Sequence, residues 1–141
     1  MKKVLVGGAF DLIHYAHILT LWEARKYGDR LIVNVNSDAR IRVKKGEARP
    51  IIPEAERIEM VRAIRWVDEV VCLTGDSEYP VLKLLDIVKP DVLVLNEVEC
   101  EDFTKEKEAC AVRGIELVRI KRIISPSGLD TSGIIRKIKA L

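Results

Sequence analysis

Histidine is nearly absent from this chain of 141 residues, which has only two, His14 and His17. Cysteine is also scarce, and the three cysteines, Cys72, Cys100 and Cys110, form no Cys-x-x-Cys clip. Because three thiols cannot all pair with one another, we expect the cysteines to be reduced. A chain of this length buries enough apolar surface to fold as one domain without disulfide staples.

Long apolar runs are also lacking. No stretch approaches the roughly 20 apolar residues that a membrane-spanning helix needs, and the first apolar run, at 4–6, is too short for a signal peptide. The net charge is only +2, with basic residues scattered along the chain. Such a charge gives no argument for a nucleic-acid partner. We therefore expect a cytoplasmic protein that binds neither a membrane nor nucleic acid.

Short runs rich in β-branched residues recur along the chain and predict five strands, at 4–6, 31–35, 69–73, 92–95 and 116–120. The runs are nearly continuous in apolar residues, which is typical of strands covered on both faces. Helical spacing of apolar residues predicts helices around 15–22, 58–64 and 81–88, and a last helix at about 131–139. This alternation predicts an α/β fold, a Rossmann-like doubly wound five-stranded parallel sheet forming a single domain over 1–141.

Helix boundaries are marked by glycine and proline. Gly28 can end the first helix, Pro53 can open the second, and Pro90 follows the third. A turn at 126–128, "PSG", precedes the last helix. In doubly wound sheets the ligand binds outside the carboxyl ends of the strands, so the segment after the first strand is a candidate site.

That segment reads "GGAFDLIHYAH" and contains both histidines. We expect Gly7 and Gly8 to let the backbone turn tightly and admit a phosphate close to main-chain N–H groups at the start of a helix. His14 and His17 are three residues apart and therefore face the same ligand. Two simpler interpretations are a capping histidine beside a surface histidine, and a zinc pair that has no obvious third ligand nearby.

The same segment resembles the G-T-F-D-x-x-H-x-G-H signature of the cytidylyltransferase-like nucleotidyltransferases. Further similar stretches follow in the order expected for that family: "NSD" at 36–38, "KKGEARPIIP" at 44–53, "RIEMVRAIRWVDEVV" at 57–71, "KPDVLV" at 89–94 and "TSGII" at 131–135. The resemblance covers nearly the whole chain.

The resemblance implies a role for each matching residue. His14 and His17 would bind the α-phosphate, while Lys44 or Lys45, expected on a loop, would neutralise the departing pyrophosphate; a solvated basic turn is the alternative for each lysine. The implied catalytic residues are His14, His17, Lys44 and Lys45. The implied nucleotide-binding residues are Gly8, Ala9, Phe10, Asp11, His14, His17, Arg65, Asn96, Thr131 and Ser132, and the implied acceptor-binding residues are Asp11, Asn36, Asp38 and Glu97.

Thr131 and Ser132 would offer hydroxyls and helix N-terminal N–H groups to the β- and γ-phosphates, although Ser or Thr at a helix start is most often a cap. The segment "RWVDE" at 65–69 can also be a structural entry into the third strand, an interpretation that we favour for its residues other than Arg65. The resemblance further implies Mg²⁺ as cofactor and a homodimer. No residue of the chain is assigned to a metal.

The chemistry of such a transfer fits these residues independently of the resemblance. A phosphomonoester has its second pKa near about 6 and is mostly dianionic at neutral pH, so it needs no general base. It needs positive donors that let one anion approach another, and the chain offers donors without a Ser or Cys nucleophile.

The run from 44 to 71 is most similar to the domain that adenylylates heptose 1-phosphate and next to glycerol-3-phosphate cytidylyltransferase. We therefore expect transfer of a nucleoside monophosphate from ATP or CTP to a sugar or polyol phosphate. The alternative is an archaeal FAD synthase that adenylylates FMN, for which a flat apolar wall could come from Tyr15, Trp22, Trp66, Tyr79 and Phe103.

Several positions depart from the family pattern. Ala9 stands for Thr, Ala16 for the Gly between the histidines, and Asn96-Glu97 for G-x-D. Ser125 stands for Arg and Asp130 for Ser. These departures keep open a second alternative, a non-catalytic nucleotide-binding module.

Two acidic features have two interpretations each. Glu97, Glu99, Glu101 and Asp102 either line the acceptor pocket or form a solvated loop that begins a helix. Asp130 either caps the last helix, which we favour, or helps to hold the metal that accompanies the triphosphate.

Overall fold

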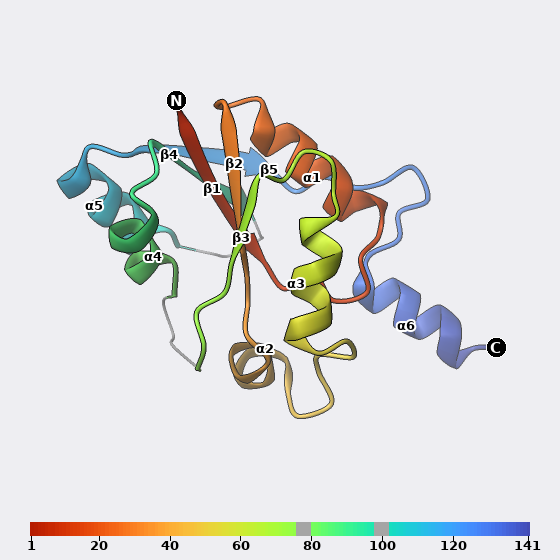
Figure 1. Cartoon of the computed structure of the whole chain (residues 1–141). Helices are drawn as coiled ribbons and strands as arrows, with labels where there is room; N and C mark the ends of the chain where they lie inside the picture. The colour runs from red at the N-terminus through yellow and green to blue at the C-terminus, as the bar shows by residue number, and fades with distance from the viewer. Residues whose placement is uncertain (76–79, 98–101) are drawn as a thin grey trace.

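A computed structural model describes residues 1–75, 80–97 and 102–141 (Figure 1). All five predicted strands are present in one sheet. Their bounds are β1 Lys3–Gly8, β2 Arg30–Val35, β3 Glu69–Val71, β4 Val92–Glu97 and β5 Glu116–Lys121. The strand order is β3-β2-β1-β4-β5 and every pairing is parallel, which confirms the doubly wound α/β fold.

The predicted helices are also present in the described residues. Their bounds are α1 Tyr15–Arg25, α3 Glu54–Arg62, α4 Pro80–Val88 and α6 Thr131–Lys139. Two further helices, α2 Asp38–Lys45 and α5 Thr104–Arg113, did not stand out in the apolar pattern because each buries so few residues. The expectation that the two lysines at 44–45 lie on a loop is wrong, since they form the last turn of α2.

The core lies on both faces of the sheet. α1 and α3 cover one face, where Leu21 and Val61 pack on Val4, Val6 and other strand residues. α4 and α5 cover the other face (Figure 1) and bury Leu84, Leu85 and Cys110 against Leu5, Ile32 and Leu93. Burial from both sides explains why the strands read as continuous apolar runs.

Glycine at position 28 has a different role from the predicted one. α1 ends at Arg25, before Gly28 is reached. A Cβ at position 28 would lie 2.6 Å from Cγ2 of Val4 and 2.7 Å from the carbonyl oxygen of Lys2. Gly28 is therefore required by the close approach of the α1–β2 connection to β1.

Other predicted boundaries hold. Pro53 is the N-cap of α3, and the turn at 126–128 has Gly128 at φ 74°, with its N–H donating to the carbonyl of Ser125 at 2.8 Å. Cys72 and Cys110 are free thiols, whereas Cys100 lies outside the described residues. No helix in the described part of the chain has both the length and the apolar content needed to cross a membrane.

Candidate active site

A cavity of about 260 Å³ opens where the predicted site was expected, beyond the carboxyl ends of the strands. Its walls come from the start of α1, the last residue of α2, the end of β4, the β5–α6 connection and the first turn of α6. The lining residues are His14, Ala16, His17, Thr20, Lys45, Asn96, Arg122, Ile123, Ile124, Gly128, Leu129, Asp130, Thr131 and Ser132. In doubly wound parallel sheets the ligand binds at the carboxyl ends of the strands, so the fold accounts for the place of this cavity.

The backbone between β1 and α1 turns at Phe10 and Leu12, which have φ of 53° and 52°. Side-chain-bearing residues rarely adopt this left-handed conformation, so the loop is held there by its surroundings. Gly8 belongs to β1, and a Cβ on it would lie 3.1 Å from the ring of buried Phe10. The prediction that the glycine pair makes the turn is wrong: Gly8 provides room for Phe10, whose ring centroid lies 5.4 Å from that of His17.

The two histidines face each other in the cavity wall. Their rings are stacked with centroids 3.8 Å apart, and the backbone N–H of His14 donates to Nδ1 of His17 at 3.2 Å. Because Nδ1 of His17 accepts a hydrogen bond, its proton belongs on Nε2. Nδ1 of His14 is buried and has no hydrogen-bond partner among the described residues.

Both imidazoles are neutral at pH 7. Burial, reinforced by the nearby His14 and Lys45, lowers the pKa of His17 to about 4. Burial also lowers the pKa of His14, with Arg122 acting in the same direction and Asp130 against it. The described residues contain no group of three or more His, Cys, Asp or Glu side chains placed to hold a metal, so the zinc interpretation gains no third ligand here. The histidines are placed to act as neutral hydrogen-bond donors.

The structure separates the two candidate lysines. Lys45 lines the cavity and Lys44 lies outside its lining. Burial and the neighbouring positive charge of Arg49 lower the pKa of Lys45, while Asp11 opposes this shift. Of the two lysines, Lys45 is therefore the one that brings a positive charge to the histidine pair.

The first turn of α6 is held in place by side chains. Asp130 is its N-cap: Oδ1 accepts from the N–H of Gly133 at 2.7 Å, and Oδ2 accepts from Nη2 of Arg122 at 2.7 Å. The hydrogen bond from Gly133, followed by the contact with Arg122, lowers the pKa of Asp130 despite partial burial. The hydroxyl of Thr131 donates to the carbonyl of Asp11 at 3.0 Å. The capping interpretation of Asp130 is confirmed.

Asp11 does not face the cavity. It is 1% exposed, and its carboxylate accepts from the N–H of Ile51 at 2.8 Å, from the N–H of Ile52 at 2.9 Å and from Nε of Arg49 at 3.3 Å. Burial alone would raise the pKa of Asp11, but these hydrogen bonds outweigh it and lower the pKa below its ordinary value. The Asp11 side chain anchors the loop before α3, and the contacts of Asp11 with nucleotide and acceptor stay a prediction that this carboxylate does not support.

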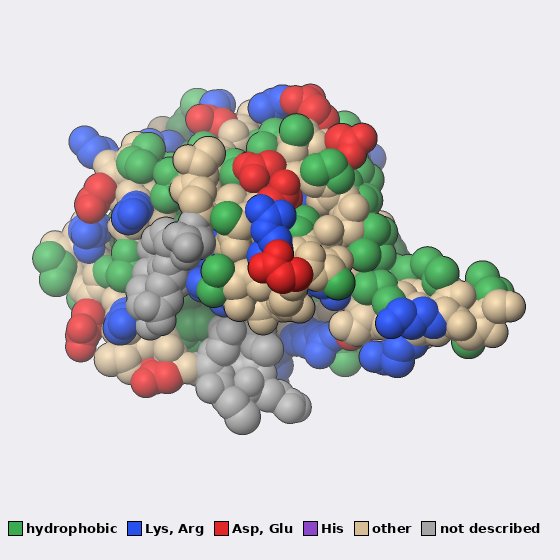
Figure 2. Space-filling view, turned by 90° about the horizontal axis from the view of Figure 1, so that it is seen from below, with side chains coloured by type: hydrophobic (Ala, Val, Ile, Leu, Met, Phe, Trp, Pro, Cys, Tyr) green, Lys and Arg blue, Asp and Glu red, His purple; other side chains and the backbone are tan. Residues whose placement is uncertain are grey.

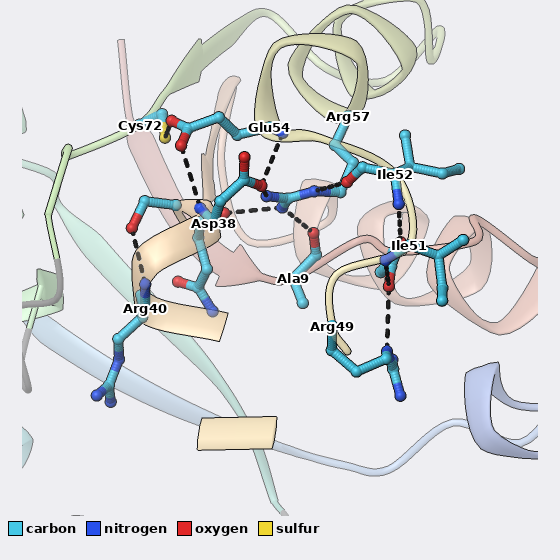
Figure 3. A network of polar contacts seen from close by, with 12 residues as sticks. Ala9, Asp38, Arg40, Arg49, Ile51, Ile52, Glu54, Arg57 and Cys72 are labelled. Carbon is cyan, nitrogen blue, oxygen red and sulfur yellow. Dashed lines mark hydrogen bonds and ion pairs between the residues drawn. The ribbon is translucent and has the colours of Figure 1, made fainter. Parts of the chain in front are cut away.

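Arg57 is the main residue that the sequence analysis missed (Figure 3). It is completely buried and donates to the carbonyls of Ala9 at 2.6 Å, Asn36 at 2.7 Å and Ile52 at 2.8 Å, and to the carboxylate of Asp38 at 2.8 Å. A signal for it exists in the sequence, since position 57 lies four residues before position 61 and so shares the apolar face of α3 with it.

The Arg57 network accounts for several predicted site residues. Asp38 also accepts from the N–H of Glu54 at 2.8 Å, and the side-chain oxygen of Asn36 accepts from Asn34 at 3.3 Å. Asn36 and Asp38 lie outside the cavity lining, so their assignment to the acceptor is not supported there. Cys72 donates to Glu54 at 3.5 Å, and burial together with that carboxylate raises its pKa to about 11, which makes it a poor nucleophile.

Arg65 lies at the end of the sheet opposite the cavity. It lies in the α3–β3 connection, is exposed, and sits 5.7 Å from the ring centroid of Trp66. A segment that leads into a strand lies at the amino end of a parallel sheet, opposite the cavity. The nucleotide contact of Arg65 stays a prediction, and the place of the residue, outside the cavity lining, does not support it.

The predicted residues at the end of β4 and after it differ in where they lie. Asn96 lines the cavity, with Oδ1 buried and unpaired among the described residues. Glu97 is exposed and outside the lining, so its predicted acceptor contact is not supported. Asp102 accepts from the N–H of Thr104 at 3.0 Å just before α5, as the helix-start interpretation requires. Glu99 and Glu101 lie outside the described residues.

Among the described residues, none of the aromatic side chains suggested as an FMN wall lines the cavity. Of the five candidates, Tyr79 lies outside the described residues, and the other four lie outside the cavity lining. Tyr15 and Trp22 are exposed, and Phe103 is buried beside Arg119 at the start of α5. The cavity is lined by hydrogen-bonding and charged groups together with aliphatic side chains.

Comparison with known proteins agrees with this geometry. Residues 5–137 match the family model described as cytidylyltransferase-like. The chain is 39% identical over 137 residues to the bifunctional protein HldE of Campylobacter fetus, covering 96% of this chain and 28% of that protein. It is also 39% identical over 139 residues to bifunctional protein HldE of Proteus mirabilis, covering 98% and 28%. The chain thus spans little more than a quarter of these curated relatives.

Two solved structures share the fold. The lipopolysaccharide core biosynthesis protein from Thermoplasma volcanium has a TM-score of 0.75 and 30% identity, covering 87% of this chain and 98% of that one. The pantothenate synthetase from Thermus thermophilus has a TM-score of 0.67 at 13% identity, covering 95% and 61%, and shows likeness of fold alone.

Proposed function

Because this chain belongs to the cytidylyltransferase-like family, we propose that it transfers a nucleoside monophosphate from ATP or CTP to a sugar or polyol phosphate and releases pyrophosphate. The observation that carries the proposal is the cavity, in which two neutral histidines, Lys45 and the N-terminus of α6 converge. A phosphorylated sugar is supported over FMN by two findings: a lipopolysaccharide core biosynthesis protein is among the similar structures, and the described aromatic side chains lie outside the cavity.

The proposed reaction is an in-line displacement at the α-phosphorus. An oxygen of the acceptor phosphate forms a bond to that phosphorus, the bond to the bridging oxygen of the β-phosphate breaks, and pyrophosphate leaves with the electron pair. The dianionic acceptor needs no base. The protein has to stabilise the charge that builds on the α-phosphate and on the leaving group.

His17 suits the first task because its Nε2 carries the proton while Nδ1 is held by the N–H of His14. A neutral imidazole fixed in this way donates a hydrogen bond to a phosphate oxygen and keeps its proton at neutral pH. Lys45 adds a positive charge beside the histidines, and the first N–H groups of α6, which have no partner within the helix, suit the β- and γ-phosphates.

Magnesium is proposed only as part of the nucleotide substrate. The described residues include no cluster of three or more potential metal-ligating side chains. The carboxylates of Asp11 and Asp130 are already occupied by protein donors. Mg²⁺ would therefore arrive on the triphosphate and supply charge neutralisation there.

The test is a matrix of the four NTPs against heptose 1-phosphate, glycerol 3-phosphate and FMN, read by pyrophosphate release, with His17→Ala as the inactive control. Release that requires both an NTP and a sugar or polyol phosphate is the expected result. Release that requires an NTP and occurs with FMN as the only effective acceptor would favour the FAD synthase alternative. Nucleotide binding with no release for any acceptor would favour the non-catalytic module.

A further inference from the structure

Arg122 brings a guanidinium to the cavity wall at a position that the family resemblance does not assign. It follows β5 directly, and its Nη2 donates to Oδ2 of Asp130 at 2.7 Å. Ser125, which stands where the family pattern has Arg, is buried with its hydroxyl 3.1 Å from that of Ser127 and lies outside the cavity lining. The cavity thus obtains its arginine from three residues earlier in the chain.

Asp130 is held rigidly at this place. One carboxylate oxygen caps α6 through the N–H of Gly133, and the other accepts from Arg122. The Asp130 side chain is therefore a fixed point to which the long, flexible arginine side chain is tethered. The hydrogen bond to Asp130 uses one of the five N–H donors of the guanidinium, which leaves others for a ligand.

We propose that Arg122 binds the terminal phosphates of the nucleotide and that Asp130 is its positioning residue. This inference rests on the proposed function, since it assumes a nucleoside triphosphate in the cavity. A guanidinium matches two phosphate oxygens at once. The Arg122 and Asp130 side chains are 59% and 38% exposed, and ion pairs exposed to that degree hold their partners only weakly. Arg122 can therefore turn toward a phosphate while Asp130 stays in its cap.

The pair also explains how an acidic residue is tolerated at a phosphate site. Asp130 alone would place a negative charge against the incoming triphosphate, at the helix end that should attract it. Arg122 cancels that charge. Both charges act on His14, whose pKa Asp130 raises and Arg122 lowers, which puts the pair within electrostatic range of the histidines.

The experiment is a double-mutant cycle on the full chain, with the binding of Mg²⁺-ATP, Mg²⁺-CTP and Mg²⁺-pyrophosphate measured by titration calorimetry. The variants are Arg122→Gln, Asp130→Asn and the double variant. Lys121→Gln is the matched control, because it removes a positive charge from the neighbouring residue, which lies outside the cavity lining. Asn caps a helix about as well as Asp, so α6 should stay intact; Asp130→Ser serves if Asp130→Asn lowers the melting temperature.

Arg122→Gln should weaken binding about 10- to 100-fold, the range for losing a hydrogen bond to a charged group, and Lys121→Gln should stay within about 2-fold of wild type. In wild type, Asp130→Asn should weaken binding by less than about 3-fold, because loss of the tether on Arg122 is offset by loss of the repulsive carboxylate charge. In the Arg122→Gln background, where the carboxylate is left unpaired, Asp130→Asn should tighten binding about 10-fold.

The following results would overturn the inference. Binding of Arg122→Gln within about 2-fold of wild type would remove the phosphate contact. An equal effect of Asp130→Asn in both backgrounds would reduce Asp130 to a cap. Failure of wild type to bind any of the three ligands would overturn the proposed function as well. If wild type releases pyrophosphate and Arg122→Gln is unimpaired, this inference alone is overturned.

Discussion

Two polar regions meet at the segment after β1, and they differ in how completely their groups are paired. The Arg57 region is closed: the guanidinium is wholly buried and its donors meet three carbonyls and the Asp38 carboxylate. The histidine cavity is open, and two of its lining atoms, Nδ1 of His14 and Oδ1 of Asn96, are buried without partners among the described residues. Saturated polar groups hold a backbone, and groups with spare capacity can meet a ligand.

The largest expected effect is on the closed region. Arg57→Met would leave the Asp38 carboxylate and three carbonyls without this donor, so we expect a loss of about 3–5 kcal/mol in the free energy of unfolding. Urea denaturation measures it. Arg62→Met, on the exposed side of the same helix, is the control and should stay within about 0.5 kcal/mol of wild type. A loss below about 1 kcal/mol for Arg57→Met would show that the network is not what holds this region.

Substitutions of the histidines should lower activity rather than stability. His17→Ala and His14→Ala should lower kcat by about 10²–10³, the loss typical of removing one transition-state donor, with nucleotide affinity within a few-fold. Steady-state kinetics and urea denaturation on the same samples separate the two effects. Tyr15→Phe, between them and exposed, should leave kcat unchanged. Near-normal turnover in both histidine variants would remove their catalytic assignment.

The two lysines sharpen the comparison within one helix turn. Lys45→Gln should lower kcat/KM about 10- to 100-fold because a positive charge is lost beside the histidines, whereas Lys44→Gln should stay within about 3-fold. Equal effects would mean that both lysines act through the general charge of α2. Repeating the comparison at high salt tests this, since screening weakens such a general effect.

The last expected effect is a pH dependence of stability. The pKa of His17 falls from 6.5 in an unfolded chain to about 4 in the folded one. Between these values the unfolded chain takes up a proton that the folded chain refuses, so stability should decrease as pH falls from about 6.5 to about 4 and be free of this contribution above pH 7. Urea denaturation at several pH values should give a shallower decrease for His17→Gln. An identical slope for wild type and His17→Gln would mean that His17 is solvated in the folded protein and that its pKa is not lowered.

The sheet and most helices follow from the sequence because the strands are buried on both faces and the helix ends carry recognisable signals. α2 was missed since only Arg40 and Ile41 in it are buried. Ser37, which accepts from the N–H of Arg40 at 3.1 Å, was the available signal.

The site was predicted in outline, and its errors have one physical origin. Position along the chain places a residue near an edge of the sheet, but it does not decide which partner a side chain takes. Asp11 turned to the backbone of Ile51 and Ile52. Arg65 was assigned by similarity of pattern, against a topology that puts it at the opposite end. Arg122 was missed because the pattern directed attention to position 125.

Helix α6 forms part of the cavity wall but packs little against the rest of the protein. None of its residues is buried, and Figure 1 shows the helix standing out from the body. Figure 2 shows Lys and Arg side chains on this projecting part. Its hold on the body described here is at its start, through Thr131 and Asp130. A helix of this length is marginal on its own, so its outer amides should exchange hydrogen for deuterium quickly in the empty protein. A phosphate bound to the first turn would slow that exchange, which makes α6 a built-in reporter of whether the cavity is filled.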